Sequence, residues 1–298
     1  MAKIVQCVPN FSEGRRTEVV EEIVGAIKGV DGVTLLDYSS DESHNRSVVT
    51  FIGEPEAVME AAFRGAQKAA EKIDMSRHSG GHPRMGATDV IPFIPVKEVT
   101  MEECVSMARK LGHRLSEELN IPVYLYEEAA SRPDRKNLSE VRRGQYEGLT
   151  ESIKEPGRKP DFGPPEVHPR AGVTAVGARP PLVAYNINLD TADVDIAKNI
   201  AFSIRGSGGG FPTVKALGIM IEETGKAQVT INVCDYKKVP LHRVFELVKR
   251  EAARYGVAVI GSELIGLAPL DAVVDAAEFY LQIDGFEHSQ ILENRLLE

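Results

Sequence analysis

The sequence has few cysteines, no long apolar run and no cluster of basic residues. Its three cysteines, Cys7, Cys104 and Cys234, are far apart and odd in number, which argues against a disulfide framework or a zinc site built from cysteines. No stretch reaches about 18 uninterrupted apolar residues and the N-terminus lacks the apolar core of a signal peptide, so we expect a cytoplasmic protein without membrane contact. Because the formal net charge is -9 and no Lys/Arg run occurs, nucleic acid is not an expected partner.

The overall composition is that of a globular enzyme. Hydrophobic residues make up 43% of the chain and charged residues 27%, so there is enough apolar material for a substantial core. A length of 298 residues predicts about two domains of roughly 150 residues each. Since the net charge is negative, an anionic substrate would need a local group of arginines.

The first half of the chain alternates predicted strands and helices. The apolar periodicity predicts strands at 3–8, 33–38, 47–53 and 122–126, and helices at 15–28, 55–72 and 100–119. Thr100 and Glu103 form a capping box at the start of the last of these helices. The apolar segment 90–96 contains Pro92 and Pro95 and is therefore predicted to be an edge strand or an extended loop.

The second half repeats the order β-α-β-β-α-β. Its predicted strands are 182–189, 214–223, 228–235 and 257–262, and its predicted helices are 191–205, 240–255 and 269–281. Two such halves predict an α+β fold of two tandem ferredoxin-like sandwiches, each an antiparallel sheet with helices on one face. Between the halves, segment 129–169 has many charges and six prolines, which predicts a linker on the surface.

Residues 77–89, RHSGGHPRMGATD, are the most distinctive segment and are called the His82 loop here. They place two histidines, two arginines, three glycines and an aspartate between two apolar segments. Gly80, Gly81 and Gly86 allow positive φ or a close approach of backbone to a ligand, and Pro83 stiffens the turn after His82. This composition is typical of an active-site loop.

His82 follows two glycines and precedes Pro-Arg, so its ring is predicted to stand on a constrained turn. A lone loop histidine is often structural, but a pKa near 6.5 also suits proton transfer in both directions. His78 and His82 have the i, i+4 spacing of two metal ligands on a helix, and His44 is a third nitrogen ligand if the fold brings it near. Gly80 and Gly81 disfavour that helix and no HExxH motif follows, so no metal is predicted and a metal hydrolase is the alternative.

Several polar residues are candidates for substrate binding. Guanidinium groups match carboxylates bidentately, which makes arginines the first choice for anionic substrates. The candidate arginines are Arg46, Arg77, Arg84, Arg170 and Arg179. Asn10, Ser12 and Glu13 lie between a strand and a helix, where they would either bind a carboxylate or, in the case of Ser12, cap the helix. Asp37, at the end of a predicted strand, would either orient a histidine or bind an amine.

A glycine-rich segment, GSGGGFP, follows Arg205. It lacks the Gly-Lys-Ser/Thr ending of a phosphate-binding loop and leads into a strand. We interpret it as a flexible connection or a mobile flap rather than a nucleotide cradle.

Four motifs occur in the order that one enzyme family shows: VPNFSEG, HPRMGA, DFGP at 161–164, and YNINL. The chain resembles the glutamate formiminotransferase family over nearly its whole length. The resemblance implies transfer of a formimino group between 5-formiminotetrahydrofolate and L-glutamate in histidine breakdown, with a tetrahydrofolate derivative as co-substrate and no required metal. It also implies a homodimer.

The resemblance further assigns roles to residues. His82 corresponds to the catalytic residue, which we expect to act as a general acid and base. From residue type and position rather than from the resemblance, Asn10, Asp37, Arg46 and Arg84 are expected to bind substrate. The expected folate-binding residues are Gly163, Pro164, Pro165, Glu166, Val167, His168, Pro169, Arg170, Ala171 and Gly172. The expected subdomains are 1–178, which carries the histidine and the folate segment, and 179–298, with a ligand groove or tunnel between them.

Two other functions remain open at this level. The protein could use 5-formyltetrahydrofolate as the donor, since a formyl group differs from a formimino group only by O for NH. It could also be a non-catalytic small-molecule sensor, because tandem ferredoxin-like units serve in regulatory modules. Some family members are fused to a cyclodeaminase, and since this sequence ends at Glu298 we expect transfer without cyclisation.

Overall fold

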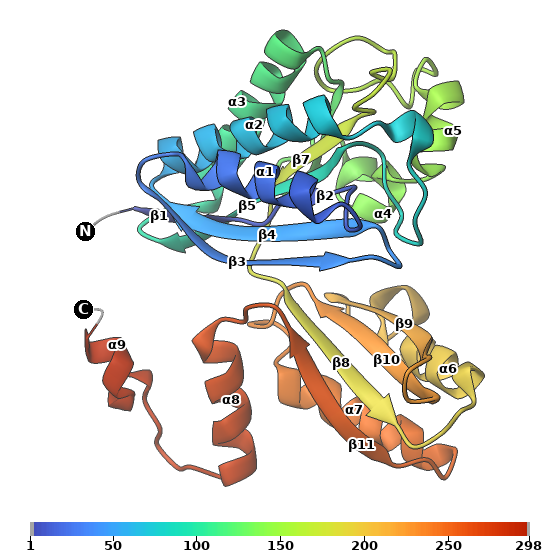
Figure 1. The fold of residues 1–298 in the computed structure, drawn as a ribbon. Helices are drawn as coiled ribbons and strands as arrows, with labels where there is room; N and C mark the ends of the chain where they lie inside the picture. Colours follow the sequence, from blue (N-terminus) through green and yellow to red (C-terminus); the bar gives the residue numbers. More distant parts are fainter. Residues whose placement is uncertain (1–2, 297–298) are drawn as a thin grey trace. The chain divides into compact units, whose positions relative to one another are not determined.

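The computed structural model describes residues 3–296 and separates into two compact units, Met1–Arg179 and Pro180–Glu298 (Figure 1). Each unit has its own sheet and its own hydrophobic core. None of the described helices is both long and apolar enough to cross a membrane.

The N-terminal unit has a mixed sheet in its described part. Its strands are β1 (Ile4–Cys7), β2 (Asn10–Phe11), β3 (Val33–Asp41), β4 (Arg46–Gly53), β5 (Thr88–Lys97), β6 (Val123–Glu127) and β7 (Thr174–Ala178). The order across the sheet is β3, β4, then β1 and β2, then β5, β7 and β6. The first four positions form the antiparallel order of a ferredoxin-like unit, as predicted. The prediction of a purely antiparallel sheet is wrong here, because β7 pairs in parallel with both β5 and β6.

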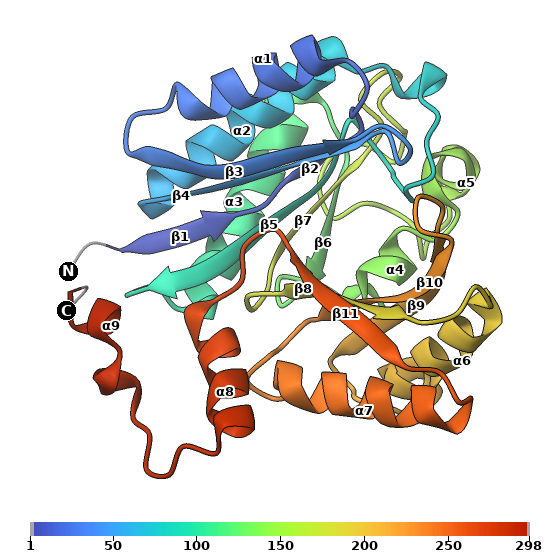
Figure 2. The ribbon, with the colours of Figure 1, turned by 60° about the horizontal axis from the view of Figure 1, so that its bottom comes forward.

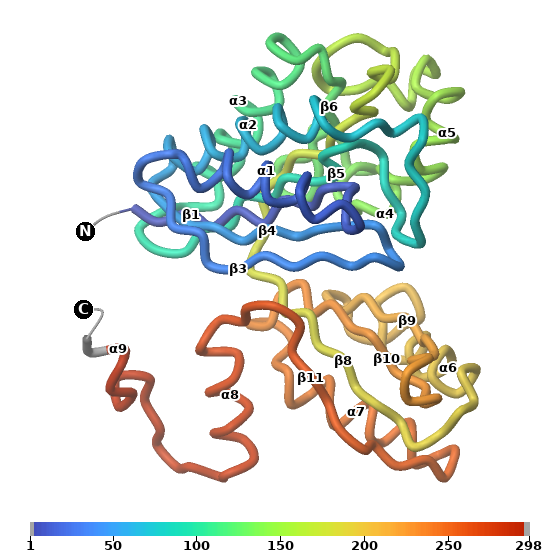
Figure 3. The backbone as a smooth tube through the Cα atoms, in the orientation of Figure 1, coloured from blue at the N-terminus to red at the C-terminus, as the bar shows by residue number. Residues whose placement is uncertain are grey.

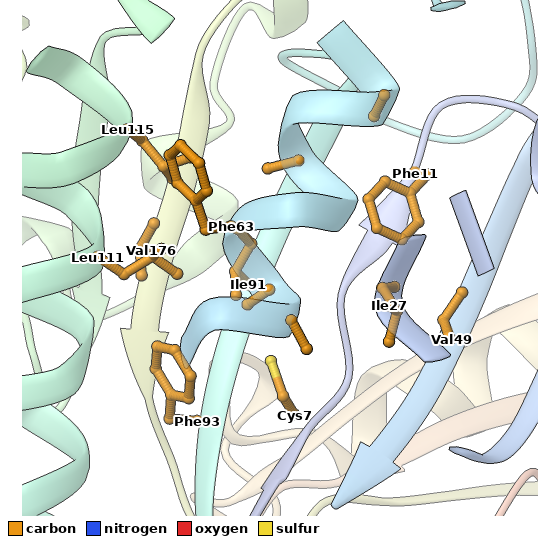
Figure 4. Packing of buried hydrophobic residues seen from close by; sticks show 14 of the residues in the cluster. Cys7, Phe11, Ile27, Val49, Phe63, Ile91, Phe93, Leu111, Leu115 and Val176 are labelled. Atoms are coloured by element: carbon orange, nitrogen blue, oxygen red, sulfur yellow. The ribbon is translucent and has the colours of Figure 1, made fainter. Parts of the chain in front are cut away.

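Three long helices cover one face of this sheet: α1 (Thr17–Lys28), α2 (Pro55–Lys72) and α3 (Met101–Leu119) (Figure 2). Their apolar residues pack against alternate residues of the strands, among them Phe11, Val49 and Ile91 (Figure 4). The predicted capping box of α3 is confirmed, because the Thr100 side chain accepts from the Glu103 amide and Glu103 accepts from the Thr100 amide.

The strand β5 corrects a prediction, because it is central rather than an edge. It pairs with β1 and β2 on one side and with β7 on the other. The prolines are tolerated because the ladder is interrupted where they lie. Pro92 stands opposite the break between β1 and β2, and Pro95 lies at a register shift opposite Val5.

Segment 129–169 is also more ordered than predicted. It contains α4 (Leu138–Val141) and α5 (Gln145–Ser152), which Figure 3 follows onward from β6. Val141, Leu149 and Ile153 of this segment form a second core cluster with residues of β5 and β6, namely Val90, Tyr124 and Tyr126. The residues next to these along the two strands belong to the core under α1–α3, so the second cluster lies on the opposite face of the sheet. The segment therefore covers part of the other face of the sheet instead of running over the surface as a linker.

The C-terminal unit has the predicted βαββαβ order. Its elements are β8 (Val183–Leu189), α6 (Val194–Ile204), β9 (Val214–Ile221), β10 (Lys226–Val233), α7 (Leu241–Arg254) and β11 (Val259–Ile265), followed by α8 (Leu270–Leu281) and α9 (Leu292–Leu296). The sheet order is β11-β8-β10-β9 and every pairing is antiparallel. The predicted α+β fold with ferredoxin-like order is confirmed in this unit.

The glycine-rich segment of this unit closes the end of α6. The Gly210 amide donates to the Arg205 carbonyl at 3.0 Å, and the Phe211 amide donates to the Ile204 carbonyl at 2.9 Å. A Cβ on Gly208 would lie 1.8 Å from the Phe202 carbonyl oxygen, so the segment needs glycine to turn back against the helix.

Candidate active site

The His82 loop lies against the segment 163–172, which is distant in sequence. The Met75 amide donates to the Arg170 carbonyl at 2.8 Å, and the Ala87 amide donates to the Ala171 carbonyl at 2.8 Å. Gly86 and Gly172 pair directly, and a Cβ on Gly86 would lie 2.2 Å from a carbonyl oxygen. The two segments with the most distinctive sequence motifs are therefore joined backbone to backbone.

His82 is half-buried in this loop with one ring nitrogen unpartnered. Its Nδ1 lies 3.4 Å from Nη1 of Arg46, and its buried Nε2 has no partner among the described residues. A guanidinium group can only donate, so Nδ1 accepts and the proton of the neutral ring is assigned to Nε2. The His44 ring lies edge-on, with its centroid 6.4 Å away.

The electrostatic surroundings keep His82 neutral. Burial lowers the pKa of the ring to about 3, and the positive charges of Arg46 and Arg142 act in the same direction. Asp41 opposes them weakly. At neutral pH the imidazole is therefore uncharged in the ligand-free protein, as a proton acceptor must be at the start of a reaction.

Arg142, which lies just after α4, carries the second charge beside His82. Its Nη2 donates to a carboxylate oxygen of Asp89, whose other oxygen accepts from the Met85 amide at 2.9 Å. Burial raises the pKa of Asp89, while the charge of Arg142 opposes that rise. Asp89 therefore fixes both Arg142 and the end of the His82 loop.

His78 and Arg84 hold the loop from within. The His78 Nε2 contacts the Asn45 carbonyl at 3.1 Å, and its Nδ1 accepts from Arg84 Nε at 3.1 Å. The remaining donors of Arg84 go to Glu147, Gln145 and the His78 carbonyl, with Glu147 bound through two oxygens at 2.6 and 2.8 Å. All five N–H groups of Arg84 are therefore occupied. The carboxylate that Arg84 holds in this structure is that of Glu147.

Comparison with known proteins agrees with these motifs. The family model of the formiminotransferase domain, N-terminal subdomain, matches residues 4–179, and that of the formiminotransferase domain matches residues 184–296. The chain belongs to the formiminotransferase family.

Curated relatives match along the chain. A glutamate formimidoyltransferase from Streptococcus pyogenes serotype M1 is 55% identical over 100% of both chains. One from Thermoplasma acidophilum is 50% identical over 98% of this chain and 97% of the relative. A formimidoyltransferase-cyclodeaminase from Gallus gallus is 49% identical over 95% of this chain but only 53% of its own length.

Three residues with predicted substrate roles share one face of the N-terminal sheet. Asn10 pairs with Val48 of β4, and Asp37 pairs with Thr50. Arg46, Val48 and Thr50 are alternate residues of one strand, so their side chains and those of their partners point to the same face of the sheet. The intervening residues of β4, such as Val49, pack towards α1–α3. Asn10, Asp37 and Arg46 are therefore on the sheet face that these helices leave uncovered.

Ser12 and Glu13 make hydrogen bonds within the chain just before α1. The Ser12 hydroxyl donates to the Gly86 carbonyl at 2.8 Å. One Glu13 carboxylate oxygen accepts from the amides of Arg15 and Arg16, each at 2.9 Å. Glu13 thus holds the turn that precedes α1, whose N-cap is Arg16 without a side-chain cap, and both Ser12 and Glu13 are buried.

Half of the ten residues in the predicted folate segment are exposed. Gly163, Pro165, Glu166, Pro169 and Arg170 are exposed, whereas Ala171 and Gly172 are buried where they meet the His82 loop. His168 lies in between, and its Nδ1 accepts from the Ala171 amide at 2.9 Å, which closes the turn. The described residues of this segment thus combine an anchored end with an accessible surface.

The motif DFGP at 161–164, where this segment begins, is explained by contacts within the fold. Asp161 forms an ion pair with Arg135 at 2.6 Å, with both side chains nearly buried, and also accepts from the Leu125 amide. Phe162 packs on α3, where Gly112 leaves room for its ring, and Gly163 has φ of +85°. The DFG sequence thus anchors the start of the folate segment beside Val123 of β6.

No metal centre is formed by the described residues. No group of three or more histidine, cysteine, aspartate or glutamate side chains is placed to hold an ion there. Both ring nitrogens of His78 have protein partners, and Nδ1 of His44 contacts Asp41 at 2.7 Å.

Arg142 is the site residue that sequence reasoning missed. It lies in the charged, proline-containing segment that was interpreted as a linker, and its partner Asp89 is far away in sequence. The one signal in the sequence was Asp89, which ends the His82 loop just before an apolar segment. A carboxylate that is buried there needs a positively charged partner from another part of the chain.

Proposed function

We propose that this protein moves a formimidoyl group between 5-formimidoyltetrahydrofolate and L-glutamate, with His82 relaying the protons. Two relatives that match over essentially their whole length are named glutamate formimidoyltransferase. The observation that carries the proposal is the buried, unpartnered Nε2 of His82, in a loop whose end at Gly86 and Ala87 is bonded to the segment 163–172. A nitrogen without a protein partner is available to a reacting group.

The chemistry requires proton transfer at two nitrogen atoms. The amine of glutamate attacks the protonated amidine carbon, which gives a tetrahedral intermediate, and the folate nitrogen then leaves. The attacking nitrogen must lose a proton and the leaving nitrogen must gain one. A neutral imidazole can do both in turn, and such a group typically contributes about 10²- to 10⁴-fold to the rate. No covalent bond to the protein is needed.

The other assignments follow from the same proposal. The segment from Gly163 to Gly172 contacts the folate, and Asn10, Asp37 and Arg46 contact the substrates from the free sheet face. Arg84 acts on the reaction only by holding the loop. Membership of the family supports a cytoplasmic homodimer that works in histidine breakdown, and size-exclusion chromatography with light scattering tests the dimer.

The test is turnover by the purified protein with two donors in parallel. L-Glutamate is incubated with 5-formimidoyltetrahydrofolate in one arm and with 5-formyltetrahydrofolate in the other, and the products are identified by mass spectrometry. We expect formimidoylglutamate at a much higher rate than formylglutamate. Formyl transfer alone would support the alternative donor, and binding of both ligands without any product would support a sensor.

A further inference from the structure

The surroundings of His82 contain donor groups that no part of the protein uses. The side-chain Nε atoms of Arg46 and Arg142 are both buried and have no hydrogen-bond partner among the described residues. An unpaired buried donor costs free energy, and a guanidinium group is an unfavourable place to leave one. Arg46 contacts the His82 ring and the charge of Arg142 acts on it, so two unused donors on these residues indicate a place for a ligand.

We propose that Arg46 and Arg142 together bind the α-carboxylate of the amino-acid substrate beside His82. This proposal rests on the proposed function and adds the residues that hold one substrate. Arg142 was absent from the predicted site, and the family resemblance gave it no role.

The geometry of Arg46 suits a carboxylate. In the described part of the chain its side chain makes one hydrogen bond, from Nη1 to His82 at 3.4 Å. The edge formed by Nε and Nη2 is therefore unused, and this edge matches the two oxygens of a carboxylate. A carboxylate bound there would be separated from the His82 ring by the width of the Arg46 guanidinium group.

Arg142 is fixed in place by the fold. Its side chain is only 16% exposed, and Asp89, which holds its Nη2, is 2% exposed. Because Asp89 is also tied to the Met85 amide, Arg142 has little freedom relative to the His82 loop. A donor that is positioned in advance binds a ligand with less loss of conformational entropy.

The charge balance around His82 also calls for an anion. The groups that act on its ring are Arg46, Arg142, His44 and Asp41. Asp41 contacts His44 at 2.7 Å, and Arg142 pairs with Asp89. Arg46 stands opposite Asp41 across β3 and β4, but within the described residues no carboxylate forms an ion pair with it. Burial and the nearby charge of Arg142 lower the pKa of Arg46, although Asp41 and Asp89 oppose this. A carboxylate would supply the missing negative charge.

The chemistry of the substrates selects the α-carboxylate. In glutamate this group and the attacking amine are attached to the same carbon, so a carboxylate beside His82 brings the amine to the ring. The γ-carboxylate is separated from the amine by the length of the side chain. The carboxylates of folate lie beyond its aminobenzoyl ring and are far from the nitrogen that carries the formimidoyl group.

Binding would also change the state of His82. A carboxylate on Nε and Nη2 of Arg46 leaves the contact from Nη1 to Nδ1 in place, so its effect on the ring is electrostatic. The added negative charge favours the protonated ring. The ring is therefore a stronger proton acceptor when the amino acid is bound.

The experiment combines Arg142→Gln with substrate analogues that lack one carboxylate. L-Isoglutamine lacks the α-carboxylate and L-glutamine lacks the γ-carboxylate. With L-glutamate we expect Arg142→Gln to lower kcat/KM by about tenfold to a hundredfold through a higher KM, as for loss of a charge-assisted hydrogen bond. The KM for the folate should stay within about twofold of wild type, and the variant should cause almost no loss with L-isoglutamine.

Arg143→Gln is the matched control, since the neighbouring side chain is 74% exposed and pairs with Glu140. If Arg142→Gln does not fold, Arg142→Lys retains the charge and should show a smaller rise in the KM for glutamate. An equal loss with glutamate and isoglutamine, or a loss that disappears with glutamine, would overturn the proposal. An inactive wild type would instead contradict the proposed function.

Discussion

Loss of the ion pair between Arg135 and Asp161 should lower the free energy of unfolding, by an amount that follows from how deeply the pair is buried. The two side chains are 7% and 9% exposed and their closest atoms are 2.6 Å apart. Arg135→Met would leave the Asp161 carboxylate buried with only the Leu125 amide and the Ser131 hydroxyl as donors. Removing one partner of a buried pair in this way costs about 3–5 kcal/mol.

The control is a neighbouring pair of the same type on the surface. Arg132 contacts Asp134 at 2.9 Å, but their side chains are 41% and 58% exposed. An exposed pair contributes about 0–1 kcal/mol, so Arg132→Met should leave the free energy of unfolding nearly unchanged. The two variants change the same residue type three positions apart and differ in burial.

The assay is urea unfolding followed by far-ultraviolet circular dichroism, because the sequence contains no tryptophan. At about 2–4 °C for each kcal/mol, Arg135→Met should also lower the melting temperature by roughly 6–20 °C. If Arg135→Met stays within about 1 kcal/mol of Arg132→Met, the buried pair does not anchor the DFG motif as described.

Three further predictions follow from the site. Gly86→Ala should lower the free energy of unfolding by about 1–3 kcal/mol or more, because the added Cβ would lie 2.2 Å from a carbonyl oxygen. Gly81→Ala should be tolerated, because its Cβ would meet nothing closer than 3.6 Å, and equal melting temperatures of the two variants would refute this. His82 has a folded pKa of about 3 and an unfolded value near 6.5, so its contribution to stability is complete above pH 6.5 and declines as the pH falls towards 3. Acidification should therefore destabilise the wild type more than His82→Gln, and parallel stability curves would contradict the burial of the ring. Burial raises the pKa of Cys7 and raises that of Cys104 to about 12, so neither thiol should react with iodoacetamide in the folded protein, as peptide mass spectrometry can check.

Local patterns were enough to predict most of the elements. The helix at 55–72 and the capping box of Thr100 and Glu103 have the predicted bounds, because periodicity and capping depend on neighbours in sequence. The role of β5 was missed because two prolines normally exclude a central strand, and only the break between β1 and β2 and the register shift at Val5 make room for them. That break is a property of the assembled sheet.

The candidate site was predictable in part for the same reason. The His82 loop and the segment 163–172 carry unusual local compositions, and the hydrogen bonds between them confirm that they lie together. Arg84 was expected to bind a substrate carboxylate, and its pairing with Glu147 could not be predicted because no spacing in the sequence reveals it. Arg142 could be identified only from the fold, which brings its side chain to the carboxylate of Asp89.

The most direct test of the central claim is the rate of formimidoyl transfer by His82→Gln, with folate affinity measured on the same sample. His113→Gln is a suitable control, because His113 is an exposed residue of α3 paired with Glu117. The account predicts that kcat falls by about 10²- to 10⁴-fold in His82→Gln, while the Kd for folate and the activity of His113→Gln stay close to wild type. Turnover by His82→Gln at the wild-type rate would contradict the assignment of the proton relay to this ring.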